Sequence, residues 1–131
     1  MGDTAYCFVC GENNPKGLHI KIFYEGEIVK TRYTFPPEYQ GWKGIIHGGL
    51  ISTLLDEMMA YAAGKEFPTV TIHLNVTFRH ALHPGEEVEV AGWVKDRNNR
   101  KVEAEAVMKR LADDKVIATA EAILLRMKKM G

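Results

Sequence analysis

The sequence has no long hydrophobic run, and this absence excludes one class of protein. The longest uninterrupted apolar stretch is residues 58–63, whereas a membrane-spanning helix needs about 18–20 apolar residues. The amino-terminal residues also lack the cationic segment followed by an apolar segment that marks secretion. We therefore expect no association with membranes and a cytoplasmic location.

An excess of charge of either sign is also missing. Seventeen Lys and Arg residues balance seventeen Asp and Glu residues, so the formal net charge is zero. Without an overall basic field the chain has no general means of holding a nucleic acid backbone, and we expect no nucleic acid partner. A net charge near zero also does little to keep subunits apart, which permits self-association.

Cysteine is scarce, with only Cys7 and Cys10 present. In a reducing compartment these two thiols form no permanent disulfide framework. A Cys-x2-Cys spacing also occurs in zinc sites, but zinc takes four ligands and this pair supplies two. A second chain or His19 would have to complete such a site. We therefore favour two thiols packed in a folded segment and predict no metal ion.

Length and composition favour one folded unit. The 131 residues fall in the usual range of single domains, about 100–150 residues. The chain is 46% hydrophobic and 26% charged, which is typical of a globular protein with a core. No internal repeat or Pro/Ser-rich linker divides residues 1–131, which we predict to be a single domain. Residues 1–17 are dense in turn formers and should form a loop-like head.

Hydrophobic periodicity predicts one helix and six strands. Residues 48–63 are rich in Leu, Met and Ala and are apolar nearly all round, which is typical of a buried helix. Gly64 suits a left-handed C-cap at its end. Alternating apolar and polar residues predict strands at 18–24, 29–35, 69–79, 87–95, 101–110 and 115–127. The prediction is an α+β fold in which an antiparallel sheet of five or six strands wraps around one long central helix, with small residues facing that helix at Ala104, Ala106, Ala118, Ala120 and Ala122.

The start of this helix carries the candidate site. Gly48 and Gly49 open the helix, where backbone N–H groups have no intrahelical partner and the dipole is positive, so an oxyanion could be held there. Asp56 and Glu57 lie further along a helix that should otherwise be buried. A carboxylate in that position must be paired, hydrogen-bonded or used in chemistry.

Helix geometry then predicts a shared site. At a rise of about 1.5 Å per residue, Asp56 lies roughly 12 Å along the helix from Gly48, too far for both to act on one carbonyl group. If two copies of the helix pack antiparallel across a two-fold axis, the amides of one chain face the carboxylate of the other. The active-site hypothesis therefore requires a homodimer.

The order His47-Gly48-Gly49, six residues and then Asp56 resembles the hotdog-fold acyl-CoA thioesterases of the 4-hydroxybenzoyl-CoA thioesterase and PaaI-like type. The resemblance covers nearly the whole chain and includes the segments at 75–78 and 84–86 and the Cys7-Phe-Val-Cys-Gly head. It implies a hotdog fold, hydrolysis of acyl-CoA to a free acid and CoA, no metal or organic cofactor, and a homodimer or a dimer of dimers.

The resemblance also implies a role for each matching residue. Asp56 would be the nucleophile or the general base that directs water at the thioester carbonyl. Gly48, alone or with Gly49, would polarise that carbonyl through backbone N–H groups. His47 would orient the thioester, and Thr71 would position the water.

One position departs from the family pattern. Many relatives place an Asn six residues before the His, and here that residue is Gly41. Gln40 is the candidate substitute, Glu57 is the reserve carboxylate, and Trp42 is expected to border the pocket. The candidates for contacting the phosphates of coenzyme A are Arg79, His80, Arg97, Arg100 and Lys101.

Simpler interpretations stand beside these. His47 could be a structural histidine, Asp56 a buried partner of Ser52 or Thr53, and the glycine pair an aid to close packing. At the level of function, the rivals are a non-catalytic acyl-CoA-binding or regulatory module, which the Gly41 departure favours, and a hydratase that acts on enoyl thioesters.

Overall fold

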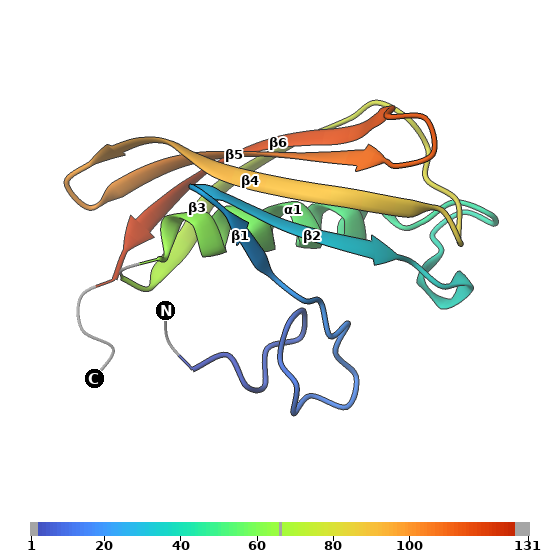
Figure 1. Cartoon of the computed structure of the whole chain (residues 1–131), viewed down its shortest axis with the longest axis horizontal. Coiled ribbons are helices and arrows are strands. Elements are labelled where there is room, and N and C mark those ends of the chain that lie inside the picture. Colours follow the sequence, from blue (N-terminus) through green and yellow to red (C-terminus); the bar gives the residue numbers. More distant parts are fainter. Residues whose placement is uncertain (1–2, 66, 128–131) are drawn as a thin grey trace.

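The computed structural model describes residues 3–65 and 67–127. Six strands form one antiparallel sheet in the order β1-β2-β4-β5-β6-β3, and the sheet curves over the single long helix α1 (Figure 1). This confirms the predicted α+β architecture. The elements, in chain order, are β1 (Phe23–Glu25), β2 (Ile28–Thr34), the short 3-10 helix η1 (Pro37–Tyr39), α1 (Gly48–Ala63), β3 (Thr69–Phe78), β4 (Glu87–Asn98), β5 (Lys101–Arg110) and β6 (Val116–Arg126).

Helix α1 has the predicted bounds, Gly48–Ala63. Its buried side chains are Ile51, Leu54, Leu55, Met58, Met59, Ala62 and Ala63. The helix ends at Gly64, whose N–H donates to Ala60 O at 2.8 Å. The predicted left-handed cap is wrong, since the φ of Gly64 is −93°. Glycine is favoured there for another reason, because a Cβ atom would lie 2.9 Å from Ala60 O.

The sheet approaches α1 closely at a glycine of β4. A Cβ atom on Gly92 of β4 would lie 2.8 Å from the backbone carbon and Cβ of Met58, so no side chain fits between strand and helix at this point. The predicted small-residue face is confirmed around this point, since five alanines of β5 and β6 are buried. They are Ala104, Ala106, Ala118, Ala120 and Ala122.

The first predicted strand, at residues 18–24, is largely wrong, because β1 covers only Phe23–Glu25. The preceding residues bond to the head instead: Leu18 N–H donates to Phe8 O and Ile20 N–H donates to Val9 O, both at 2.9 Å. Between them His19 has a left-handed φ of 55°, which interrupts an extended strand. Residues 3–22 contain turns but no helix or strand, and they lie on the side of α1 away from the sheet (Figure 1).

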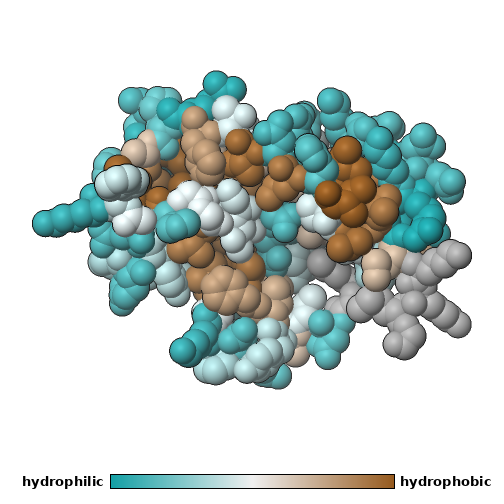
Figure 2. Space-filling model, turned by 180° about the vertical axis from the view of Figure 1, so that it is seen from behind, coloured by the Kyte–Doolittle hydropathy of each residue, from teal (hydrophilic) through white to brown (hydrophobic). Residues whose placement is uncertain are grey.

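Strand β3 is one edge of the sheet, and among the described strands it pairs with β6 alone. It carries large apolar side chains that are 38–56% exposed, and Figure 2, seen from behind, shows hydrophobic side chains exposed on this side of the molecule. An exposed apolar edge strand is a surface that another chain can cover. These side chains are Val70, Ile72, Leu74 and Phe78.

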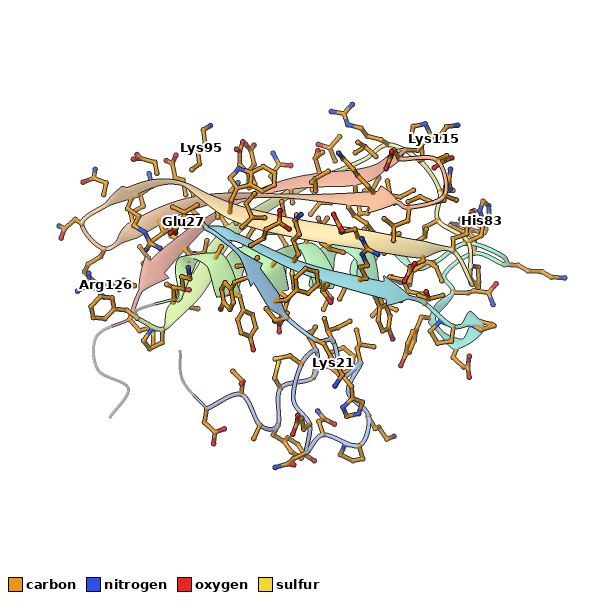
Figure 3. All side chains as sticks on the ribbon, viewed as in Figure 1. Lys21, Glu27, His83, Lys95, Lys115 and Arg126 are labelled. Carbon is orange, nitrogen blue, oxygen red and sulfur yellow. The ribbon has the colours of Figure 1, made fainter. Side chains whose placement is uncertain are left out.

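The outer face of the sheet, away from α1, is polar. Figure 3 shows charged side chains projecting from it, with Lys95 and Lys115 labelled. Among the described residues, no helix has the length and hydrophobicity needed to cross a membrane.

Candidate functional site

The N-terminus of α1 has one unused backbone donor. His47 is the N-cap, and its Nδ1 accepts a hydrogen bond from Gly49 N–H at 2.9 Å. The N–H of Leu50 donates to His47 O at 3.0 Å. No described residue accepts a hydrogen bond from Gly48 N–H. Of the two predicted oxyanion donors, Gly48 is therefore free to bind a ligand, and Gly49 already binds the histidine.

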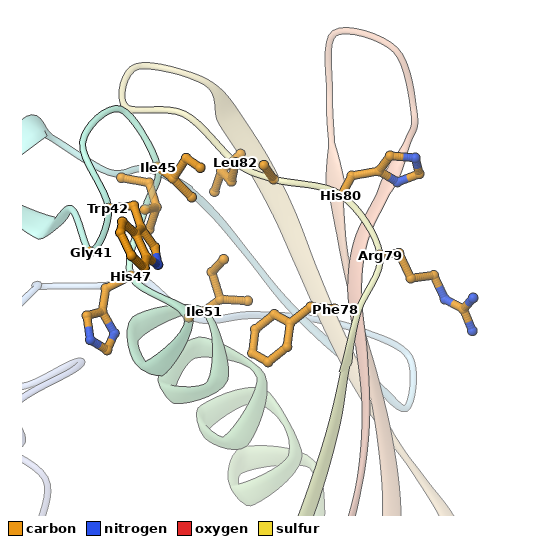
Figure 4. Close-up of a pocket in the computed structure, with 12 residues that line it drawn as sticks. Gly41, Trp42, Ile45, His47, Ile51, Phe78, Arg79, His80 and Leu82 are labelled. Carbon is orange, nitrogen blue, oxygen red and sulfur yellow. The ribbon is translucent and has the colours of Figure 1, made fainter.

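A cavity of about 660 Å³ opens beside this donor (Figure 4). Gly48 is part of its wall, and a Cβ atom there would lie 3.3 Å from the ring of Phe78. Figure 4 shows Ile51 of α1 and Phe78 at the end of β3 on facing sides of the opening. The cavity is lined by Gly41, Trp42, Ile45, Ile46, His47, Gly48, Ile51, Phe78, Arg79, His80, Ala81 and Leu82.

Several of these lining residues were not predicted. Phe78 was assigned only to an alternating strand, and Leu82 had no assigned role. Leu82 is fully buried, and its carbonyl accepts Ile46 N–H at 2.8 Å, which holds the loop before α1 against the segment after β3. The signal in the sequence was weak, because the contact joins positions 36 residues apart.

Asp56 and Thr71 lie together, as the predicted site requires. The Thr71 hydroxyl donates to Asp56 Oδ1 at 2.8 Å, and both side chains are half-buried. A register shift in the β3–β6 pairing falls between Thr71 and His73. A shift of this kind changes which side chains face the helix, and Thr71 is on the helix side of β3. The pair fixes one carboxylate oxygen and leaves the other available.

The structure does not bring Asp56 to Gly48 within one chain. Eight residues of helix separate them, which is about 12 Å, and Asp56 is absent from the cavity wall. The cavity and the Asp56–Thr71 pair are therefore separate features of a single chain.

Of the residues singled out in the loop before α1, one borders the cavity and another contacts its own loop. Trp42 is 85% exposed and borders the cavity, as predicted. Gln40 binds its own loop, since its Nε2 donates to Pro37 O at 2.7 Å and its Oε1 accepts from Gly44 N–H. Gly41 lies against His47, and a Cβ atom at Gly41 would be 3.4 Å from the imidazole Cδ2, an ordinary contact.

The five basic candidates separate into two groups, since Arg97 and Lys101 lie at the same end of the sheet as Arg100. Arg79 and His80 line the cavity, and in Figure 4 their side chains extend away from α1. Arg100 lies at the other end of the sheet, where its guanidinium donates to Arg126 O at 3.3 Å. Arg126 pairs with Thr69, and the ten residue steps from position 69 to position 79 span about 33 Å. One chain therefore does not place Arg100 near Arg79 and His80.

Glu57 faces away from the cavity, toward the head. Cys7 Sγ donates to Glu57 Oε2 at 3.8 Å. Burial raises the pKa of the Glu57 carboxyl above its ordinary value, and the neighbouring Asp56 raises it further. The predicted reserve carboxylate thus lies among the cysteines of the head.

Comparison with known proteins gives a consistent result. A family model described as the thioesterase superfamily matches residues 43–117. An uncharacterized protein of Schizosaccharomyces pombe is 44% identical over 41 residues, which span 29% of this chain and only 23% of that protein.

Solved structures match over most of the chain. The PaaI protein of the phenylacetic acid degradation operon of E. coli superposes with a TM-score of 0.81 at 18% identity, over 89% of this chain and 87% of that one. A Streptococcus mutans protein solved bound to acetyl CoA superposes with a TM-score of 0.77 at 16% identity, over 86% of this chain and 91% of that one. At these identities the matches show a shared fold, which is the predicted hotdog fold.

Proposed function

The chain belongs to the thioesterase superfamily, and on that premise we propose that it hydrolyses acyl-CoA thioesters to a free acid and CoA in a site shared by two chains. The family match supports thioester hydrolysis in general. The acyl-CoA assignment is supported by the acetyl CoA bound in the Streptococcus mutans neighbour. The shared site is supported by the separation of Asp56 from the cavity.

The observation that carries this proposal is the unused N–H of Gly48 in the wall of the 660 Å³ cavity. A thioester carbonyl oxygen gains negative charge when water attacks it, and a backbone donor at a helix N-terminus stabilises that charge. The apolar part of the wall, with Ile51 and Phe78, suits an acyl chain.

Asp56 acts in this proposal as the general base. It takes a proton from water while the water oxygen bonds to the carbonyl carbon, and the resulting oxyanion accepts the Gly48 hydrogen bond. The carbon–sulfur bond then breaks and the sulfur leaves as the CoA thiolate. Asp56 passes the proton that it took from water to this thiolate. Thr71, which donates to Asp56 Oδ1, orients the carboxylate so that Oδ2 faces the water.

Dimerisation brings the two half-sites together. In an antiparallel pairing of two α1 helices, Gly48 of one chain lies opposite Asp56 of its partner. The exposed apolar edge strand β3 runs beside α1 and supplies a surface for this pairing. The partner's Asp56 would then complete the cavity.

The first test is thiol release from short, medium, long and aromatic acyl-CoAs. Asp56→Asn preserves size and removes the base, so we expect its kcat to fall by at least about 100-fold. Asp96→Asn on the exposed part of β4 is the matched control and should keep wild-type activity. Equal activity of Asp56→Asn and wild type would refute the role of Asp56.

A mixing experiment tests the shared site itself. Asp56→Ala and Gly48→Pro are each expected to be inactive as pure dimers. Unfolding and refolding an equimolar mixture should restore about a quarter of wild-type activity, because half of the dimers are mixed and each mixed dimer has one intact site. No recovery, with mixed dimers demonstrated by mass spectrometry, would show that both residues act from one chain.

A non-catalytic acyl-CoA-binding module is the second candidate, and Gly41 favours it. The family Asn is missing, and the neighbouring Gln40 amide is occupied by its own loop. Stoichiometric binding of acyl-CoA without thiol release from any substrate would establish this alternative. Gly41→Asn, whose side chain would lie against His47, should then confer measurable hydrolysis.

A further inference from the structure

The head and the outer side of α1 bring together three potential metal ligands. The Sγ atoms of Cys7 and Cys10 and a carboxylate oxygen of Glu57 all lie within 4.8 Å of one another, and all three residues are half-buried. From this juxtaposition we propose that Cys7, Cys10 and Glu57 bind a zinc ion that clamps the head to α1.

The spacing of the ligand atoms suits zinc. Tetrahedral zinc, with distances of about 2.3 Å to sulfur and about 2.1 Å to oxygen, separates its ligand atoms by roughly 3.5–3.8 Å. Cys7 Sγ and Glu57 Oε2 are 3.8 Å apart. Two thiolates and one carboxylate leave the fourth position to a water molecule. The Tyr61 hydroxyl lies 2.9 Å from Cys10 Sγ.

The turn that carries the cysteines is preformed. Val9 N–H donates to Cys7 Sγ at 3.4 Å, a bond that holds the sulfur in place within the turn. Gly11 N–H donates to Cys7 O at 2.9 Å, which closes the turn after Cys10. Gly11 is buried, and a Cβ atom there would lie 2.3 Å from Cys7 N, so only glycine fits.

A cation would neutralise what is otherwise an acidic cluster. Within the described residues, Glu57 takes part in no salt bridge. Zinc binds cysteine as the thiolate, so about two protons should be released to the buffer for each ion bound.

An ion can reach this cluster from solvent. An opening of about 380 Å³ is lined by Cys10, His19, Tyr61 and neighbouring residues of the head. The ion would connect positions about 50 residues apart, because the cysteines belong to the head and Glu57 belongs to α1. Its role is structural: it holds the head against the helix that also carries Asp56.

The test measures zinc by elemental analysis after the reduced protein has been refolded with zinc and dialysed. We expect about one zinc per chain for the wild type and for Tyr61→Phe, because the phenol is not one of the proposed ligands. Cys7→Ser and Cys10→Ser should lose at least about 100-fold in zinc affinity. Glu57→Gln should lose about 10-fold, whereas Glu27→Gln, on the exposed β1–β2 turn, should lose nothing.

Cobalt substitution and thermal unfolding give independent readouts. Cobalt bound in place of zinc should show thiolate charge-transfer absorption in the wild type that Cys7→Ser and Cys10→Ser weaken. Removing the metal with a chelator should lower the unfolding temperature by roughly 5–10 °C. The same chelator should leave the unfolding temperature of the double cysteine variant unchanged.

Three results would overturn the proposal. The first is reduced wild-type protein that takes up no zinc. The second is a zinc affinity that Glu57→Gln leaves unchanged, which would mean that the two thiols bind zinc without the carboxylate. The third is a Cys7–Cys10 disulfide that persists in glutathione buffer at cytosolic redox poise, which would make the pair a redox element instead.

Discussion

Replacing Gly48 by proline would remove one hydrogen-bond donor from the proposed site and leave the helix intact. Gly48 is the first residue of α1, the position where proline is favoured because its missing N–H has no intrahelical acceptor. The preceding residue, His47, already has φ −60° and ψ 128°, the extended conformation that proline requires before it. The backbone therefore accepts this substitution.

The size of the effect follows from what the donor does. A single oxyanion donor contributes about 100- to 1,000-fold to kcat, or about 2.7–4 kcal/mol. Gly48→Ala is the matched control, because its Cβ makes the same 3.3 Å contact with the Phe78 ring and it keeps the N–H. Phe78 is half exposed and can shift to accommodate either side chain. Gly48→Ala should therefore stay within a few-fold of wild type.

The assay is steady-state thiol release with the best acyl-CoA, together with circular dichroism and the unfolding temperature. We expect Gly48→Pro to have at least about 100-fold lower kcat than Gly48→Ala at similar stability. A folded Gly48→Pro protein within about threefold of Gly48→Ala would show that this N–H does not stabilise the transition state.

Three further perturbations test other parts of the structure. Ile72→Lys on β3 should raise the dimer dissociation constant by about 1,000-fold, since a buried unpaired charge costs about 4 kcal/mol. Light scattering would detect the dissociation, and Phe23→Lys on the opposite edge strand β1 should leave the dimer intact. Gly92→Ala should lower the free energy of unfolding by about 1–3 kcal/mol, measured in urea, because its Cβ would meet the α1 backbone; unchanged stability would contradict that contact. The hydrogen bond from Arg110 lowers the pKa of Asp113 below its ordinary 3.8, so the pair stabilises the protein above that pH and stops doing so as the pH falls through the lowered pKa. The gap in unfolding temperature between wild type and Arg110→Gln should therefore narrow as the pH falls below 3.8 and through the lowered pKa, and a constant gap would exclude this linkage.

Local pattern was sufficient to predict the helix and most strands. After the opening glycine pair, residues 48–63 carry no β-turn signal and are apolar nearly all round, and α1 has those bounds. The first strand was wrong because an alternating pattern cannot show that Leu18 and Ile20 bond to the head or that His19 adopts a left-handed φ.

The candidate site was predictable where a motif along one element, or the family resemblance, assigned a role to a residue. The Asp56–Thr71 contact agrees with the family resemblance. Two features of the site emerge only from the three-dimensional structure. His47 Nδ1 accepts the Gly49 N–H, and the Glu57 side chain points toward Cys7. Nothing in the sequence indicated that Glu57 lies near the cysteines, because about 50 residues separate them.

In the proposed dimer, each helix α1 is one rigid element shared between two reaction centres. Its first residue serves one centre and Asp56, two turns later, serves the other. The contact at Gly92 fixes the helix to the sheet near Met58, close to Asp56 and far from Gly48. A small tilt about this pivot would move the amide of one centre much further than the carboxylate of the other. Substitutions in the sheet at its contact with α1 should therefore weaken transition-state stabilisation in one centre before they disturb the base in the other.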